Sequence, residues 1–269
     1  MAERIKTHDE CAYWDALADT YQAITRISCR DFHYGPQIPG ERRLRLLPPL
    51  TAGMTALELG CGAAQYSVWL AKQGLHCVAM DVSKNQLAHA AALVAREAVD
   101  VRLVRSPIER FHLYCHGQRF DFIHSSHALE FVQRPGRIIK TMASFLRPGG
   151  HVMVSTVHPL YNGSWVTGMV EDDDGQVYDG QFLTDYFEPP DDVRDDNGCR
   201  VISRAYPVSS WFAWFRAAGL EVTALAEPKA VRSAPYTSDD WADHGGQLDR
   251  VPSTVILIGR KGGGDVLGG

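Results

Sequence analysis

The chain lacks the sequence features of secreted, zinc-binding and membrane-spanning proteins. Its six cysteines occur without the CxxC or CxxH spacing of zinc ligands, so we expect reduced thiols and no structural metal. The longest apolar runs are only a few residues and could not span a bilayer, and the first residues show no apolar segment of a secretory signal. These absences predict a cytoplasmic protein with no membrane partner.

An excess of positive charge is also absent. The 269 residues contain 27 Lys and Arg against 32 Asp and Glu, a net charge of −5, which argues against a nucleic-acid partner held by phosphate contacts. Eleven acidic residues lie in 171–196 beside a single basic one, Arg194, so this segment carries −10 and the rest of the chain +5. We interpret it as a solvated hairpin or loop; the alternative is that it attracts a cationic, amine-bearing substrate.

The remaining pattern alternates between strand-like and helix-like segments. Strands are predicted at 55–59, 76–80, 101–105, 120–124 and 151–155, separated by helices at 64–73, 84–98 and 135–146. Ser83 is a good N-cap for the second of these helices. A helix at 208–218 and strands at 220–226 and 252–259 follow. The alternation predicts an α/β fold, a doubly wound parallel sheet with helices on both faces.

Three segments do not fit this alternation. Residues 1–50 are predicted to form a helical N-terminal extension, interrupted at 33–40, that acts as a lid. Residues 51–261 form the main domain, with an insertion at about 159–206 after the fifth strand. The glycine-rich tail 262–269 can bury almost nothing and is predicted to be disordered.

The segment 57–62 carries the strongest functional signal. An apolar strand runs into a Gly-x-Gly turn and then a helix, which lets the backbone approach a ligand and offers free N–H groups. Gln65 stands where a dinucleotide fingerprint has its third glycine, which disfavours NAD or FAD. Glu58 would repel a phosphate and attract an ammonium group, and Asp81 is placed to accept hydrogen bonds from both ribose hydroxyls. Together they predict a nucleoside that carries an amino acid.

Four motifs in this order resemble those of class I S-adenosylmethionine-dependent methyltransferases that act on small molecules. They are the glycine turn at 58–62, the strand end at 80–83, the segment 120–130 and the turn 146–150. The resemblance covers residues 40–158 closely. It implies a Rossmann-like sheet of seven strands, mostly parallel with the last strand antiparallel, and S-adenosyl-L-methionine as the cofactor.

The resemblance also implies which residues meet the cofactor. The glycine turn would face its methionine part, Asp81 its ribose, and Val82 with 106–108 its adenine, while Ser125 and Ser126 would line the methyl-transfer pocket. Ser106 departs from the acidic residue found in many relatives, so its contact with adenine would be weaker. The full set of predicted cofactor-binding residues is Tyr21, Glu58, Gly60, Cys61, Gly62, Asp81, Val82, Gln86, Ser106, Pro107, Ile108, Ser125 and Ser126.

Three histidines are candidate catalytic residues. A neutral amine acceptor needs no dedicated base, whereas a hydroxyl acceptor does, and His33, His127 and His158 are the candidates for that base. Tyr34, next to His33 in the interrupted extension, is the candidate substrate-binding residue. The structural alternative is that these side chains simply pack within the fold.

The sequence therefore predicts methyl transfer to an oxygen or nitrogen atom of a small-molecule acceptor, such as a specialised metabolite. The alternatives are an RNA methyltransferase, a protein that binds the cofactor without turnover, and an NAD(P)-dependent oxidoreductase. A homo-oligomer is left open.

Overall fold

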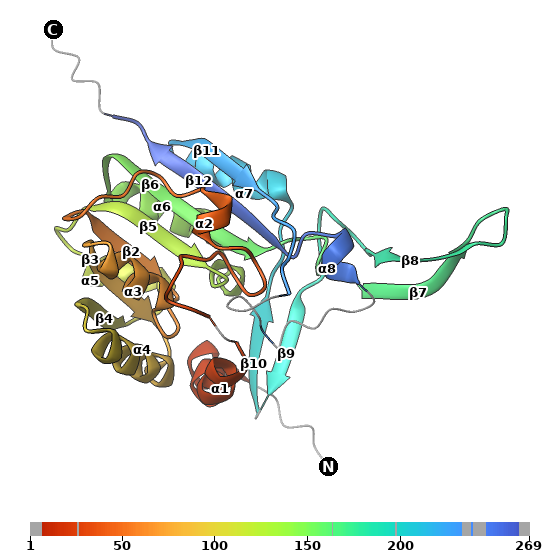
Figure 1. The fold of residues 1–269 in the computed structure, drawn as a ribbon, viewed down its shortest axis with the longest axis horizontal. Coiled ribbons are helices and arrows are strands. Elements are labelled where there is room, and N and C mark those ends of the chain that lie inside the picture. Colours follow the sequence, from red (N-terminus) through yellow and green to blue (C-terminus); the bar gives the residue numbers. More distant parts are fainter. Residues whose placement is uncertain are drawn as a thin grey trace, which may run out of the picture.

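A seven-stranded sheet forms the centre of the computed structural model, which describes residues 7–25, 27–162, 164–196, 198–232, 238 and 246–263. The strand order is β11-β12-β6-β5-β2-β3-β4 (Figure 1), and β12 alone runs against the other six. This confirms the predicted doubly wound sheet with an antiparallel last strand. The strands are β2 (Thr55–Leu59), β3 (His76–Asp81), β4 (Val101–Arg105), β5 (Phe120–Ser126), β6 (Leu146–Val157), β11 (Leu220–Ala226) and β12 (Thr254–Lys261).

Helices connect these strands on both faces of the sheet. They are α3 (Gln65–Lys72), α4 (Lys84–Glu97), α5 (Phe111–Tyr114), α6 (Pro135–Phe145), α7 (Val208–Ala217) and α8 (Gln247–Arg250), with 3-10 turns η1 (Ile108–Arg110) and η2 (Leu129–Phe131). As predicted, α4 begins after Ser83, whose side chain accepts a hydrogen bond from the Gln86 N–H. The segment 146–150 belongs to β6, and the register with β5 shifts between Phe120 and Phe122.

The alternation of side chains along each strand divides the core into two layers. Leu57 and Leu59 of β2 pack with α6 and α7 in one apolar cluster, whereas Ala56 packs with α3 and α4 in the other. Glu58 shares the face of Ala56 because side chains two residues apart point the same way. This alternation places the Glu58 carboxylate on the side of the sheet that α3 and α4 cover.

The N-terminal extension contains β1 (Thr7–His8), α1 (Glu10–Ile24) and α2 (Glu41–Leu44). Residues 31–40, in which we expected part of a lid, are all buried. Phe32, Tyr34 and Ile38 belong to the same apolar cluster as α3. This segment therefore fills part of the core, where its apolar side chains pack with Phe122 of β5, Met153 of β6 and Ile256 of β12.

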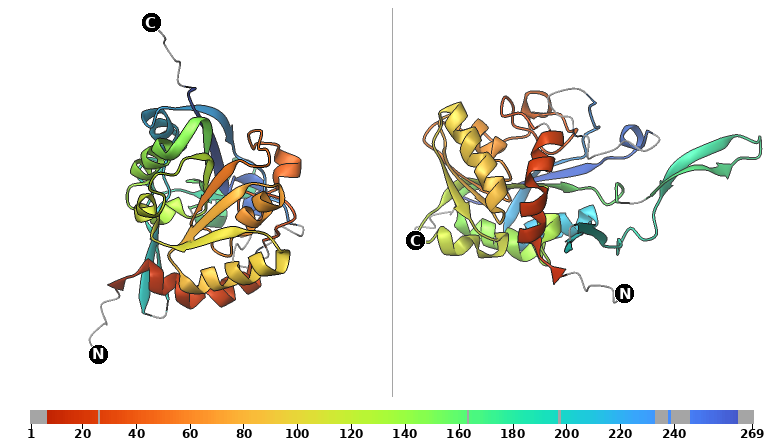
Figure 2. Two further views of the ribbon diagram at one scale, coloured as in Figure 1. Left: turned by 90° about the vertical axis from the view of Figure 1, so that its left-hand side faces the viewer. Right: turned by 90° about the horizontal axis from the view of Figure 1, so that it is seen from below.

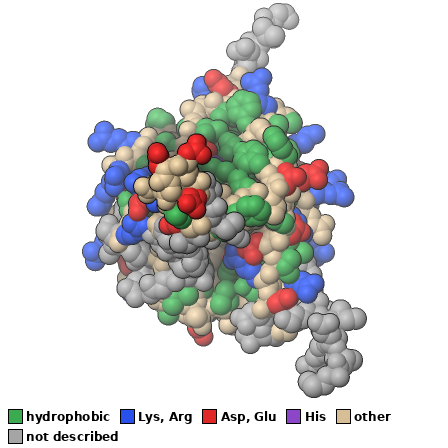
Figure 3. Space-filling model, turned by 90° about the vertical axis from the view of Figure 1, so that its right-hand side faces the viewer, with side chains coloured by type: hydrophobic (Ala, Val, Ile, Leu, Met, Phe, Trp, Pro, Cys, Tyr) green, Lys and Arg blue, Asp and Glu red, His purple; other side chains and the backbone are tan. Residues whose placement is uncertain are grey.

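The insertion after β6 forms two hairpins. β7 (Ser164–Glu171) and β8 (Val177–Phe182) pair in an arm that projects from the body (Figures 1 and 2), and β9 (Asp192–Asp196) and β10 (Cys199–Ser203) join β1 in a small sheet. The acidic segment 171–196 thus runs from the end of β7 through β8 to β9, with 183–191 in no strand, which agrees with the hairpin or loop that we interpreted. Figure 3, which views the molecule from the side of the arm, shows acidic side chains beside apolar ones.

All six cysteines are free thiols. Within the described part of the chain, no helix combines the length and apolar character that crossing a bilayer requires. Of the predicted disordered tail, residues 264–269 lie outside the described residues.

Candidate functional site

A pocket opens at the carboxyl ends of β2, β3 and β5, where ligands bind in open α/β sheets. Four residues of α1 line it and form its roof, and Figure 2 shows α1 lying beside α4. Its lining residues are Glu10, Trp14, Tyr21, Gln22, Ile27, Pro36, Gly60, Cys61, Gly62, Gln65, Tyr66, Asp81, Val82, Gln86, Pro107, Ile108, Ser126, His127, Ala128, Phe131 and Val132. Ten of the thirteen predicted cofactor-binding residues are among them.

The glycine turn forms one wall of the pocket. Gly60 and Gly62 have φ of +72° and +52°, a left-handed conformation that favours glycine. A Cβ on Gly60 would lie 2.3 Å from the Cβ of Ala128, so a larger residue would force the two segments apart. The N–H groups of Gly60 and Cys61 donate to the Met80 carbonyl at 2.8 and 2.9 Å, which fixes the turn against the end of β3.

Asp81 lies at the end of β3, beside this turn. Its Oδ2 accepts from the Gly62 N–H at 2.8 Å and its Oδ1 from the Ser83 N–H at 2.9 Å. Burial raises the pKa of Asp81, although both N–H groups act in the opposite direction. A carboxylate has about four acceptor positions, so each oxygen keeps one for a ligand hydroxyl.

An apolar slot continues from Asp81 along the pocket. Val82, Pro107 and Ile108 line it, in agreement with their predicted place beside a flat base. Ser106 does not line the pocket, because it is buried and its hydroxyl donates to the Pro107 carbonyl at 3.0 Å. Ser125 is also turned away and donates to the Leu59 carbonyl at 2.9 Å. Of the predicted serines, Ser126 alone lines the pocket.

Glu58 lies beneath the turn and does not line the pocket. Its carboxylate accepts from the backbone N–H of Ser67 at 3.0 Å and from the Ser67 hydroxyl, which anchors α3 to β2. Burial raises the pKa of Glu58 to about 8, against the opposing effect of Ser67. The structure therefore does not support the direct ammonium contact that we expected of Glu58, because the strand alternation turns its carboxylate toward α3.

Cys61 lines the pocket but does not have the character of a nucleophile. Burial raises the pKa of its thiol well above the ordinary value, and the carboxylates of Asp81 and Glu58 raise it further. Among the described residues, no three His, Cys, Asp or Glu side chains are grouped so that they could hold a metal ion.

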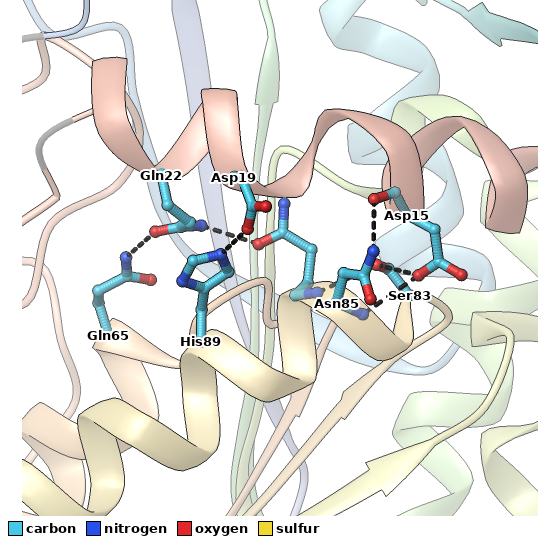
Figure 4. Close-up of polar contacts among 8 residues, drawn as sticks. Asp15, Asp19, Gln22, Gln65, Ser83, Asn85 and His89 are labelled. Atoms are coloured by element: carbon cyan, nitrogen blue, oxygen red, sulfur yellow. Dashed lines mark hydrogen bonds and ion pairs between the residues drawn. The ribbon is translucent and has the colours of Figure 1, made fainter. Parts of the chain in front are cut away.

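Three glutamine side chains cross the pocket beside Gly62, and we call them the glutamine bridge. Gln65 of α3 donates from Nε2 to Gln22 Oε1 at 3.0 Å, and Gln22 Nε2 donates to Gln86 Oε1 of α4 at 2.8 Å. Figure 4 shows Gln22 reaching down from α1 toward Gln65. A Cβ on Gly62 would lie 3.7 Å from Gln86 Oε1 and 3.8 Å from Gln22 Nε2, so the bridge lies directly over the glycine turn.

Two aspartates continue this polar attachment of α1 to α4 (Figure 4). Asp15 Oδ1 accepts from the Ser83 hydroxyl at 2.6 Å and from the Asn85 N–H at 3.2 Å. Asp19 pairs with His89 at 2.7 Å. Only Tyr13 and Ala18 of α1 are buried among its described residues. Hydrogen bonds therefore hold the face of α1 that lies on α4, whereas Tyr13, Trp14 and Leu17 on α1 pack in an apolar cluster with Phe131 and Val201.

His127 is the predicted catalytic histidine that lines the pocket. It follows β5 with a φ of +50°, and its backbone N–H donates to the Ser155 carbonyl at 2.8 Å. Its Nδ1 lies 3.3 Å from Glu130 Oε1, and its Nε2 lies 3.2 Å from the Thr254 hydroxyl. The ring is thus oriented by partners on both sides.

The other two predicted histidines lie outside the pocket lining. His33 is buried with Nδ1 3.1 Å from the Gly35 carbonyl, and burial lowers its pKa to about 4. His158 Nε2 lies 2.7 Å from Glu227, and its Nδ1 accepts from the Leu160 N–H at 3.1 Å. Burial lowers the pKa of His158 despite Glu227. These contacts favour the structural alternative for both.

Tyr34 is buried in the core and does not line the pocket, so the structure does not support its predicted contact with substrate. Its hydroxyl donates to Glu41, and its carbonyl accepts from the Ser155 hydroxyl. The pKa of the Tyr34 hydroxyl is raised far above its ordinary value by burial and by Glu41. Its side chain fills the core because segment 31–40 packs directly on the sheet.

Sequence reasoning missed several lining residues, among them Trp14, Gln22, Tyr66 and Phe131. A signal for α1 was present, since Asp15, Asp19 and Gln22 repeat at the spacing of one helix face. The pattern indicates a polar helix face, but it does not show which part of the fold that face contacts.

The pocket fits an amino-acid nucleoside. The left-handed turn leaves one wall without side chains, the Asp81 carboxylate offers acceptors for a ribose, and the apolar slot suits a flat base. A phosphate would find two carboxylates, Glu10 and Asp81, and no Lys or Arg among the described lining residues.

Known proteins resemble this chain in both sequence and fold. A family model described as a methyltransferase domain matches residues 32–225, a range that begins after α1. The ubiquinone biosynthesis O-methyltransferases of Marinobacter nauticus and Serratia proteamaculans are 32% and 28% identical over 108 and 104 residues, which is 40% and 39% of this chain. The matched segments span only 45% and 43% of those relatives' lengths.

A solved structure shares the fold. The S-adenosylmethionine-dependent methyltransferase of Mesorhizobium loti superimposes with a TM-score of 0.63 at 23% identity, over 82% of this chain and 96% of that one.

Proposed function

Because the chain belongs to the class I S-adenosylmethionine-dependent methyltransferases, we propose that it transfers a methyl group to an oxygen or nitrogen atom of a small-molecule acceptor. The observation that carries the proposal is the convergence of the Gly60–Gly62 turn and the Asp81 carboxylate on one pocket, joined by a hydrogen bond of 2.8 Å. The relatives that methylate a small molecule support the choice of acceptor class.

Named residues would hold the cofactor. The backbone of Gly60 and Gly62 would face its methionine part, Asp81 would accept from its ribose hydroxyls, and Val82, Pro107 and Ile108 would enclose its adenine. When bound, S-adenosylmethionine supplies an electrophilic methyl group on a positively charged sulfur. The chain would then contribute placement of the acceptor and exclusion of water, and α1 is positioned over the pocket to do both.

The acceptor atom determines whether a base is needed. An amine in its neutral form carries its own lone pair, whereas a hydroxyl must give up its proton. His127 would take that proton, with Glu130 beside its Nδ1 to orient the ring and balance its positive charge. Its Nε2 would give up its contact with the Thr254 hydroxyl and accept a hydrogen bond from the acceptor hydroxyl instead.

A titration and a transfer assay test the proposal together. We expect S-adenosylhomocysteine to bind the full chain in calorimetry. We also expect methyl-labelled S-adenosylmethionine to label a fraction of low-molecular-mass metabolites and not RNA. Labelling of RNA would favour the RNA methyltransferase alternative, and tight binding with no labelling of any fraction would favour a protein without turnover. Absence of binding would contradict the proposal.

A further inference from the structure

Beyond the glycine turn and Asp81, the pocket has an apolar wall in which Tyr21, also a predicted cofactor residue, adjoins residues that the cofactor prediction does not include. Trp14 and Tyr21 from α1 and Phe131 and Val132 at η2 line it, and we call these four residues the aromatic wall. We propose that the aromatic wall is the acceptor site and that it takes an uncharged aromatic ring system. This inference rests on the proposed function, and it adds the chemical class of the acceptor.

The wall joins two segments that are far apart in the sequence. The ring centroids of Trp14 and Phe131 lie 5.3 Å apart with an interplanar angle of 82°, and those of Trp14 and Tyr21 lie 5.8 Å apart at 81°. Trp14 and Tyr21 are seven residues apart on α1, which places them on one face of the helix. Edge-to-face contacts of this kind hold aromatic rings in defined orientations, so the surface is suited to a flat apolar molecule.

The charges that line the pocket disfavour an anionic acceptor. Among the described lining residues none is Lys or Arg, and the two carboxylates are those of Asp81 and Glu10. Asp81 belongs to the cofactor side, and Glu10 also lines a neighbouring groove with Val82 and Pro107, which places it at the adenine end. A carboxylate or phosphate bound at the aromatic wall would lose its hydration with no cationic side chain in the lining to pair with, which is costly. Arg194, whose Cζ lies 5.9 Å from the Phe131 ring centroid, does not line the pocket and pairs with Asp192.

The wall depends on the position of α1. Trp14 directly precedes Asp15 in α1. The hydrogen bonds of Asp15, Asp19 and Gln22 fix the position of α1 on α4 and α3. α1 precedes the residues that match the methyltransferase-domain family. Two of the four residues of the aromatic wall, Trp14 and Tyr21, thus belong to a segment that the family match does not include.

Binding of two naphthalene probes tests the inference without turnover. The full chain is saturated with S-adenosylhomocysteine and titrated with 2-naphthol, which is uncharged at pH 7, and with 2-naphthoate, which is anionic. We expect 2-naphthol to bind at least about tenfold more tightly, since only the anion must be desolvated without a partner. Equal binding, or tighter binding of 2-naphthoate, would overturn the inference.

Variants then assign the binding to the wall. Trp14→Ala should weaken 2-naphthol binding by about tenfold, and Trp14→Phe should restore most of it, because a phenyl ring keeps an aromatic contact with Phe131. The matched control is Phe212→Ala, which removes an exposed aromatic ring of α7 that does not line the pocket. If Trp14→Ala binds 2-naphthol as tightly as Phe212→Ala does, the acceptor site lies elsewhere.

Failure of the proposed function gives a different result. A chain that does not bind S-adenosylhomocysteine contradicts the methyltransferase proposal. The naphthol titrations of the chain alone, with Trp14→Ala and Phe212→Ala, then still decide whether the aromatic wall is a binding site.

Discussion

The carboxylate of Asp81 accepts a hydrogen bond from the backbone N–H of Gly62, with 2.8 Å between Oδ2 and N. This contact joins the end of β3 to the turn after β2, two segments whose strands lie side by side in the sheet. The residue proposed to bind the ribose therefore also fixes the turn proposed to face the methionine part. Loss of Asp81 should affect both ends of the cofactor site.

Replacement of Asp81 tests this coupling. Asp81→Ala should weaken binding of S-adenosylhomocysteine by about 1–3 kcal/mol, because ligand hydroxyls and the Gly62 N–H lose their acceptor. The measurement is calorimetric titration. Asp100→Ala, which removes an exposed carboxylate before β4, is the control and should bind as the unmodified chain does. Equal affinities of the two variants would contradict the ribose role.

The glutamine bridge should contribute to cofactor affinity as well. Gln22→Ala removes the hydrogen bonds to Gln65 and Gln86, and we expect binding of S-adenosylhomocysteine to weaken by about 1–2 kcal/mol as α1 loses its attachment over Gly62. Asp19→Asn is the matched control on the same helix, because it weakens only the exposed contact with His89 and should change affinity by less than about 1 kcal/mol. If the Asp19 variant loses as much affinity as the Gln22 variant, general loosening of α1 explains the loss.

Gly35 should be intolerant of a side chain because of its contact with His127. A Cβ at this position would lie 2.4 Å from His127 Nε2. Gly53 also has a positive φ but nothing within 4 Å of its added Cβ, so Gly53→Ala isolates the backbone effect. In urea unfolding, Gly35→Ala should be less stable than Gly53→Ala by about 1–3 kcal/mol. Equal stability would show that segment 31–40 can move away from His127.

Glu58 should make stability fall as pH rises. Its pKa is raised from 4.5 to about 8 in the fold, so between these values the folded chain keeps a proton that the unfolded chain has lost. Stability then decreases with increasing pH across that window, since the folded state binds more protons. Glu58→Gln removes this contribution. The difference in unfolding free energy between pH 5 and pH 8 should therefore be smaller for the variant than for the unmodified chain, and an unchanged difference would contradict the buried, protonated carboxyl.

The sequence predicts the sheet well because strands and helices are encoded locally. The alternation of segments from residue 55 onward predicts the parallel strands, and Ser83 predicts the start of α4. The antiparallel direction of β12 came from the family resemblance, since a hydrophobic pattern is the same in both chain directions. Asp81 and the glycines line the pocket where the sequence places them, because positions at strand ends can be identified from the sequence.

Among the predicted site residues that the structure does not support are His33, Tyr34 and Glu58, whose burial depends on partners distant in the sequence. His33 and Tyr34 belong to a segment with turn residues, yet the segment fills the core, because its apolar side chains pack on the face of the sheet formed by β5, β6 and β12. Glu58 could have been placed correctly, since Ala56 shares its face and packs against α3. The position of Trp14 at the pocket could not be predicted in this way, because it depends on where α1 packs on the rest of the fold.

The account depends most directly on which ligand the glycine turn accepts. The decisive measurement is parallel calorimetric titration of the full chain with S-adenosylhomocysteine and with NAD⁺. We predict saturable binding of S-adenosylhomocysteine at one site and no binding of NAD⁺. Saturable binding of NAD⁺ with none of S-adenosylhomocysteine would contradict the account.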